Sequence, residues 1–247
     1  MSEASRPLIV GHSHSAALFE AADFARVPFT PFSFWLEAGA VVFDGEHVTL
    51  SDTLRGHLAT APLVVSAVEG ASYLVLALFA SGHPFDFVAA WAPHLPRDPH
   101  AELVPADAIS AVLRHADLRA MALLRALVAE TKGDFVQVLP PPPVRELTHE
   151  NTAALCSLMG SLLGRPAPRV SGSDTEALLL WKLWRVMSEQ YADVGRSLGI
   201  RVLPPPPATL DDEGFLRAEF AHDVGHGKRA YGVEVLRALG LHASGAR

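Results

Sequence analysis

The chain has 247 residues, of which 49% are hydrophobic, and a formal net charge of −7 at pH 7. This length and apolar content suffice for a substantial core, and we expect a single domain over residues 1–247. The negative charge and scattered basic residues argue against nucleic acid or an anionic membrane surface as the main partner. The one cysteine, Cys156, excludes an internal disulfide and a cysteine metal cluster.

The start of the chain, MSEASRPLIVG, has no basic region that leads into a long apolar segment. Apolar runs elsewhere stay shorter than the roughly 18 residues that a membrane span needs. We therefore expect a soluble, cytoplasmic protein.

Strand and helix patterns alternate along the chain. Short runs rich in Val, Ile and Leu predict strands at 7–11, 61–68, 134–139 and 199–203, with one more in either 29–36 or 40–43. Because these runs do not alternate with polar residues, they are typical of parallel strands covered on both faces. Helices are predicted at 15–25, 48–60, 107–133, 149–164, 173–199 and 231–240. This order predicts a doubly wound α/β domain with a mostly parallel sheet.

Two segments have the same form, a buried strand followed by four prolines: FVQVLPPPPVRE (135–146) and IRVLPPPPATL (200–210). Proline cannot continue a strand ladder, so each run ends its strand abruptly. Ligands of open α/β sheets bind at the carboxyl ends of the strands, which places these prolines at the mouth of a site. The alternative is a rigid connector with no role in binding.

The first motif, LIVGHSHSAALFEAA (8–22), leads from an apolar strand into a helix with Ser13 at the junction. A helix N-terminus offers free N–H groups and the positive end of the helix dipole, and both favour an oxyanion beside a serine. Ser13 is therefore a candidate nucleophile. The plainer alternative is that Ser13 or Ser15 only caps the helix.

The last motif, FAHDVGHGKRAYGVEVLRAL (220–239), places Asp223 and His226 three residues apart, just before the terminal helix. A nucleophilic serine needs a base, and the base needs a carboxylate that orients it. This spacing brings a carboxylate to the far imidazole nitrogen of its neighbour. The alternative is an aspartate that caps the helix beside a solvent-facing histidine.

Together, the two motifs resemble the SGNH (GDSL-like) hydrolase superfamily. GHSHSAAL is similar to the first block of the family, and HDVGHGKRAYG is similar to its last block. The resemblance implies a flavodoxin-like three-layer α/β sandwich. It also implies Ser13 as nucleophile, His226 as base and Asp223 as orienting acid. The implied activity is that of a serine esterase or acyl hydrolase that acts on a small-molecule ester, an acylated sugar being one candidate, without a cofactor.

The middle block, EGASYLVLAL, departs from the family pattern. The family carries Gly-Asn here, and the resemblance places Gly70 and Ala71 at these positions, with Tyr73 where a histidine can occur. The implied oxyanion hole consists of the Ser13 and Gly70 N–H groups, with Ala71 in place of the asparagine. Loss of one side-chain donor costs on the order of 100- to 1,000-fold in rate. The chain is therefore either an enzyme with another donor or a weak or inactive binding protein.

The candidate replacement donors are Ser72, Tyr73 and His14, and His12 stands where the family has an aspartate. These four residues are also candidates for the substrate pocket. A different alternative is a metallohydrolase whose ligands are His12, His14, His222 and His226 with Asp223. Because an acid, base and nucleophile explain the same residues with fewer assumptions, we expect no metal.

Overall fold

The computed structural model describes residues 6–45, 47–68, 71–79, 84–166 and 170–241, and a five-stranded parallel sheet lies at its centre. Its strands are β1 (Leu8–Gly11), β2 (Thr30–Ser33), β5 (Leu63–Ala67), β8 (Asp134–Val138) and β9 (Arg201–Leu203). They are ordered β2-β1-β5-β8-β9, and every neighbouring pair is parallel. This is the flavodoxin-like strand order, and it confirms the predicted α/β fold.

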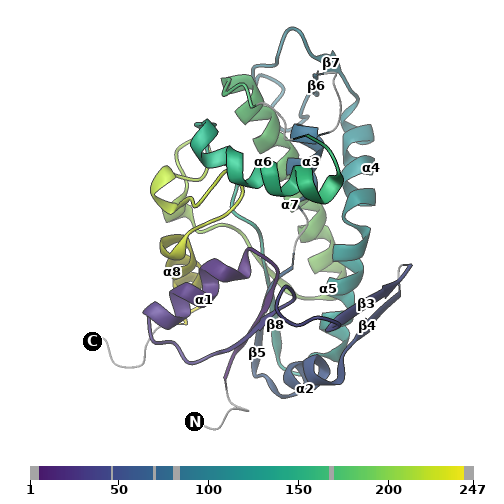
Figure 1. Ribbon diagram of the computed structural model, residues 1–247, viewed down its shortest axis with the longest axis vertical. Helices are drawn as coiled ribbons and strands as arrows, with labels where there is room; N and C mark the ends of the chain where they lie inside the picture. The colour runs from purple at the N-terminus through teal and green to yellow at the C-terminus, as the bar shows by residue number, and fades with distance from the viewer. Residues whose placement is uncertain (1–5, 46, 69–70, 80–83, 167–169, 242–247) are drawn as a thin grey trace.

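Helices cover both faces of the sheet, which gives three layers. They are α1 (Ser15–Phe24), α2 (Asp52–Thr60), α3 (Ser72–Phe79), α4 (Ala106–Ala116), α5 (Leu118–Glu130), α6 (His149–Leu163), α7 (Asp174–Leu198) and α8 (Arg229–Ala238). Figure 1 shows α1 and α8 together on one side of the sheet, with α5 and α7 on the other. Among the described residues, no helix is both long and apolar enough to cross a bilayer.

Two small sheets lie outside the central one. β3 (Val41–Asp44) pairs antiparallel with β4 (His47–Leu50), and β6 (Phe85–Asp86) pairs parallel with β7 (Glu102–Leu103). Both segments expected to contain one further strand therefore contain one, since β2 joins the central sheet and β3 forms a hairpin. The segment expected as a helix over 48–60 begins as strand β4, and the helix starts only after Ser51, whose hydroxyl accepts from the Leu54 N–H.

The long helix expected over 107–133 is two helices, which corrects the sequence prediction. α4 ends and α5 begins at Asp117, which has a non-helical backbone (φ −93°, ψ 6°). Asp117 is only 1% exposed, and its carboxylate accepts a hydrogen bond from Ser72 in α3. The break therefore turns a buried carboxylate toward a neighbouring helix.

A buried ion pair fastens the segment around β6 to α7. Lys182 is 1% exposed, and its ammonium group donates to Asp86 and to the Phe87 carbonyl. Asp86 also accepts from the backbone N–H groups of Phe87 and Asp98. A buried charge pair is tolerated only with such additional hydrogen bonds. The helical pattern alone placed Lys182 no differently from any other residue of α7.

The closest approach between helices joins the two ends of the chain. Gly232 in α8 lies against α1, where an added Cβ would stand 2.1 Å from the Ala17 carbonyl oxygen and 2.8 Å from the Ala21 Cβ. Only glycine allows this approach without a shift of backbone. Since Ser13 precedes α1 and His226 precedes α8, the contact also sets how the two terminal motifs meet.

We expect Gly232→Ala to lower the free energy of unfolding by about 2 to 3 kcal/mol, because the new methyl group meets backbone atoms that cannot rotate away. Urea unfolding of both proteins measures the difference. Gly56→Ala is the matched control, since Gly56 lies inside α2 with nothing within 4 Å of an added Cβ. That change should raise stability by about 0.5 to 1 kcal/mol. Equal stability of Gly232→Ala and wild type would contradict the tight contact.

Candidate functional site

Ser13 lies in the turn between β1 and α1, at the carboxyl edge of the sheet. The turn is held by the His12 carbonyl, which accepts from both the N–H and the hydroxyl of Ser15. Ser15 rather than Ser13 therefore closes the turn. Gly11 is required just before it, because an added Cβ would stand 2.7 Å from the Ala67 carbonyl oxygen of β5. The Ser13 side chain is left at the exposed surface of the edge.

His226 and Asp223 lie in the tight turn before α8. The Asp223 carboxylate accepts from the backbone N–H groups of Gly225 and His226, each at 2.8 Å. The same carboxylate lies 2.9 Å from Nδ1 of the His226 ring. These contacts fix the ring at both its backbone and its side chain. The expectation that three-residue spacing brings the carboxylate to the imidazole nitrogen agrees with this geometry.

The two terminal motifs meet at one hydrogen bond. Nε2 of His226 lies 2.9 Å from Oγ of Ser13, across 213 residues of sequence. The side chains of His226 and Asp223 are 19% and 17% exposed, so the pair is largely shielded while Ser13 faces solvent. With Nδ1–H donating to Asp223, Nε2 is the acceptor for the Ser13 hydroxyl. This is the geometry of an acid–base–nucleophile array.

The pKa of Asp223 is lower than its ordinary value. Burial alone would raise it, but the hydrogen bond and charge of His226 outweigh burial, and the N–H groups of Gly225 and His226 add to the effect. The carboxylate thus stays ionised at neutral pH. An ionised carboxylate on Nδ1 stabilises a positive charge on the ring when Nε2 takes a proton.

A second imidazole lies flat against the base. The rings of His14 and His226 are stacked, with centroids 4.5 Å apart and an interplanar angle of 29°. Burial, and secondly the nearby charge of His226, hold the pKa of His14 well below its ordinary value. His14 is therefore neutral at pH 7. Behind it, Pro140 and Pro141 line the same small cavity, so the first proline run does lie beside the terminal motifs.

His12 points to a different set of neighbours. Its ring lies 5.0 Å from the Phe34 ring and 6.4 Å from the Trp35 ring, just after β2. Burial lowers the pKa of His12. Trp35 is 63% exposed, so an aromatic wall stands next to the residue that precedes Ser13.

The oxyanion hole is only partly described. Gly70 lies outside the described residues. Ala71 stands at the start of α3, where its carbonyl accepts from Val75 N–H. Tyr73 is fully buried, and its hydroxyl would be 3.6 Å from a Cβ on Gly225, so it packs beneath the His226 turn. Within the described part of the chain, no hydrogen bond from the Ser13 N–H is found.

The residues of the metal alternative do not converge. Among the residues that the structure describes, no three His, Cys, Asp or Glu side chains are grouped as a metal site. Both ring nitrogens of His226 are engaged, one with Asp223 and the other with Ser13. His222 is exposed.

Ser72 turns away from the His226 turn. Its hydroxyl donates to Asp117 at 3.0 Å, and both side chains are buried. Burial raises the pKa of Asp117 to about 6, and the Ser72 hydrogen bond only partly offsets this effect. Sequence reasoning missed Asp117, although one signal was present. An acidic residue stands on the apolar stripe that includes Leu113 and Met121, four residues to either side.

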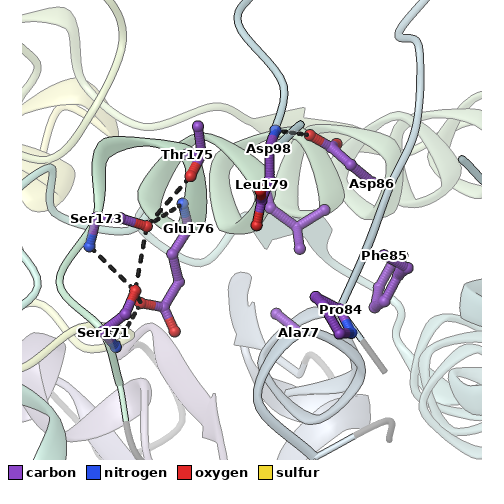
Figure 2. Close-up of a pocket in the computed structure, with 10 residues that line it drawn as sticks. All are labelled: Ala77, Pro84, Phe85, Asp86, Asp98, Ser171, Ser173, Thr175, Glu176 and Leu179. Atoms are coloured by element: carbon purple, nitrogen blue, oxygen red, sulfur yellow. Dashed lines mark hydrogen bonds between the residues drawn. The ribbon is translucent and has the colours of Figure 1, made fainter. Parts of the chain in front are cut away.

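Another pocket lies at the start of α7, with a volume of about 280 Å³. Figure 2 shows its two sides. Ser171, Ser173 and Glu176 are hydrogen-bonded to one another on one side, and Asp86 accepts from Asp98 on the other. None of the residues predicted for the site lines it, so its polar groups serve to hold the ends of these segments.

Comparison with solved structures gives several similar folds. The periplasmic domain of a lipopolysaccharide acetyltransferase from Salmonella ser. Paratyphi A is 13% identical with a TM-score of 0.47, over 96% of this chain and 82% of that one. A phospholipase A1 from Streptomyces albidoflavus is 11% identical with a TM-score of 0.47, over 96% and 98%. A GDSL-like lipase from Bacteroides thetaiotaomicron is 11% identical with a TM-score of 0.40, over 97% and 87%.

These matches bear out the resemblance to SGNH/GDSL-like hydrolases. No protein-family model and no curated protein sequence matches the chain. Since the identities are low and the TM-scores are below 0.5, the activity must be inferred from the chain's own residues.

We expect Asp117→Asn to change how stability depends on pH. The folded-state pKa of about 6 lies above the ordinary value of 3.8, so the stabilising effect of the protonated form is full below pH 3.8 and is lost as pH rises through 6. Wild type should lose about 2 kcal/mol more than Asp117→Asn between pH 4.5 and 7.5. Urea unfolding of both proteins across this range measures it, and parallel curves would contradict the buried, titrating carboxyl.

Proposed function

We propose that the chain is a serine esterase or acyl hydrolase that cleaves a small ester through Ser13, His226 and Asp223. The observation that carries the proposal is the continuous hydrogen-bonded line from Asp223 through His226 to Ser13, with both contacts at 2.9 Å. Similarity to structures described as a lipase, a phospholipase A1 and an acetyltransferase domain is consistent with ester chemistry.

In this mechanism, Ser13 Oγ attacks the ester carbonyl while its proton passes to Nε2 of His226. The tetrahedral intermediate collapses, the ester C–O bond breaks, and the proton on His226 passes to the departing alcohol. Water then attacks the acyl-serine by the same route in reverse, which releases the acid and restores Ser13. Asp223 remains ionised throughout and holds the ring in the required tautomer.

His14 supports the charged form of His226 in this scheme. A neutral ring stacked on His226 presents its π face to the imidazolium that forms in the transition state. Because His14 is held neutral, it adds no opposing positive charge. The stack also restricts rotation of the base away from Ser13.

The oxyanion is bound by the Ser13 and Gly70 N–H groups in this proposal. The missing asparagine at Ala71 favours the second candidate, a protein that binds esters with little turnover. Ser72 does not supply the missing donor where it stands, because its hydroxyl donates to Asp117. Restoration of the amide by Ala71→Asn therefore separates the two candidates.

The direct test is hydrolysis of p-nitrophenyl acetate and butyrate with EDTA present. We expect Ser13→Ala and His226→Ala to fall at least about 1,000-fold below wild type, because each removes a part that the others cannot replace. His222→Ala is the matched control and should keep wild-type activity, since His222 is exposed and lies in the same turn. Activity that needs His222, or that EDTA removes, would contradict the serine mechanism.

If wild type and both variants are equally inactive, Ala71→Asn decides the outcome. A gain of about 100-fold would identify an intact site that lacks one oxyanion donor. No gain would contradict the esterase proposal and leave the binding protein.

A further inference from the structure

A groove of about 530 Å³ lies between α3, α4 and α6. This volume is within the usual range of ligand pockets, about 300–1,000 Å³. Its walls are mostly apolar side chains from all three helices, among them Val75, Leu76, Phe79, Val112, Leu113 and Met159. Leu163, at the end of α6, also lines the groove and is 42% exposed. An open space lined in this way favours an apolar ligand.

One end of the groove is polar. Ser72 and Asp117 line it beside Ala71, and the Ser72 hydroxyl occupies only one of the two carboxyl oxygens. The other oxygen, Oδ1 of Asp117, is fully buried and has no hydrogen-bond partner among the residues that the structure describes. A buried polar atom of this kind calls for a partner, and a few such atoms in an apolar pocket are typical of a binding site.

The polar end is also the end nearer the His226 turn. α3 starts just after Ala71, and its opposite face packs beneath that turn, where Leu74 Cδ1 would stand 2.7 Å from a Cβ on Gly225. α6 reaches the same turn, since Asn151 at its start accepts from the Val224 N–H at 3.0 Å. Both helices thus contact the His226 turn and then continue as walls of the groove. The groove and the triad share these two elements.

The length of the groove follows from α3. From Ala71 to Phe79 the helix rises roughly 12 Å, at about 1.5 Å per residue, which accommodates an extended chain of about eight carbons. At the far end, Arg165 closes the space by donating to the Phe79 carbonyl. The groove therefore runs from a polar end beside Ala71 to a closed apolar end.

We propose that this groove binds the acyl chain of the substrate, a medium-length aliphatic chain of about eight carbons, with Asp117 and Ser72 at the carbonyl end of that chain. The proposal rests on the proposed esterase function, because the chain bound there belongs to the ester cleaved at Ser13. It assigns the substrate class as medium-chain esters rather than acetates.

Binding can be tested without turnover. The chain has four methionines, and Met159 lines the groove while Met121 and Met187 are buried in the core. In protein labelled with ¹³C at the methionine methyl groups, titration with 1-octanol should shift the Met159 resonance saturably. The Met121 and Met187 resonances should stay unchanged.

Turnover gives the second measurement. Wild type should hydrolyse p-nitrophenyl octanoate with a kcat/KM at least about tenfold higher than the acetate, because the added methylenes are buried in the groove. Val112→Trp places a large ring over the groove from a position that is 50% exposed, so folding is spared. It should lower the octanoate-to-acetate ratio at least about fivefold and leave the acetate rate unchanged.

Leu158→Trp is the matched control, since Leu158 is 55% exposed on α6 and does not line the groove. It should keep the wild-type ratio. A Met159 shift that Val112→Trp abolishes, together with the lowered ratio, supports the proposal. An absent Met159 shift, or a ratio that both tryptophan variants leave unchanged, overturns it. If wild type cleaves none of the esters, the proposed function fails, and a saturable Met159 shift then supports the groove as an apolar site by itself.

Discussion

The packing of α1 against α8 is the contact on which the site depends. Gly232 lets the two helices approach until backbone meets backbone at Ala17. α1 carries Ser13 just before its start, and α8 follows His226 by two residues. The 2.9 Å hydrogen bond between residues 213 positions apart is thus set by two rigid helices rather than by flexible loops. A small displacement of α8 would lengthen that bond and separate the base from its nucleophile.

Electrostatics around His226 follow from the same arrangement. On one side, Asp223 is kept ionised by hydrogen bonds that outweigh its burial. On the other side, His14 is kept neutral by burial. A negative charge and a neutral ring therefore flank the imidazole, and both tolerate a positive charge on it. Tyr73, from α3, packs beneath the turn and completes the surroundings of the base.

Much of this arrangement could be predicted from the sequence. Apolar runs indicate the four inner strands, because a parallel strand buried on both faces leaves few polar residues. Ser13, Asp223 and His226 could be named because their chemistry and local spacing are short-range features. Their meeting was only implied by the resemblance, since no local pattern encodes the contact at Gly232.

The features that could not be predicted depend on distant partners. The break at Asp117 looks like continuous helix, because its partner Ser72 is 45 residues away. The pairing of Lys182 with Asp86 spans 96 residues and leaves no periodic signal. The groove is likewise formed by three helices that no local pattern brings together. In each case the decisive interaction is a tertiary contact between polar or apolar groups that are individually ordinary.

The most direct test of the central claim is covalent labelling of the nucleophile. A fluorophosphonate reacts with an activated serine, forming an O–P bond as fluoride leaves, and intact-mass and peptide analysis count and locate the label. Wild type should take one label, on Ser13, and His226→Ala should react at least about 100-fold more slowly, because the proton acceptor is gone. A label on another residue, or an equal rate in His226→Ala, would contradict the claim that packing of α1 on α8 creates an activated serine.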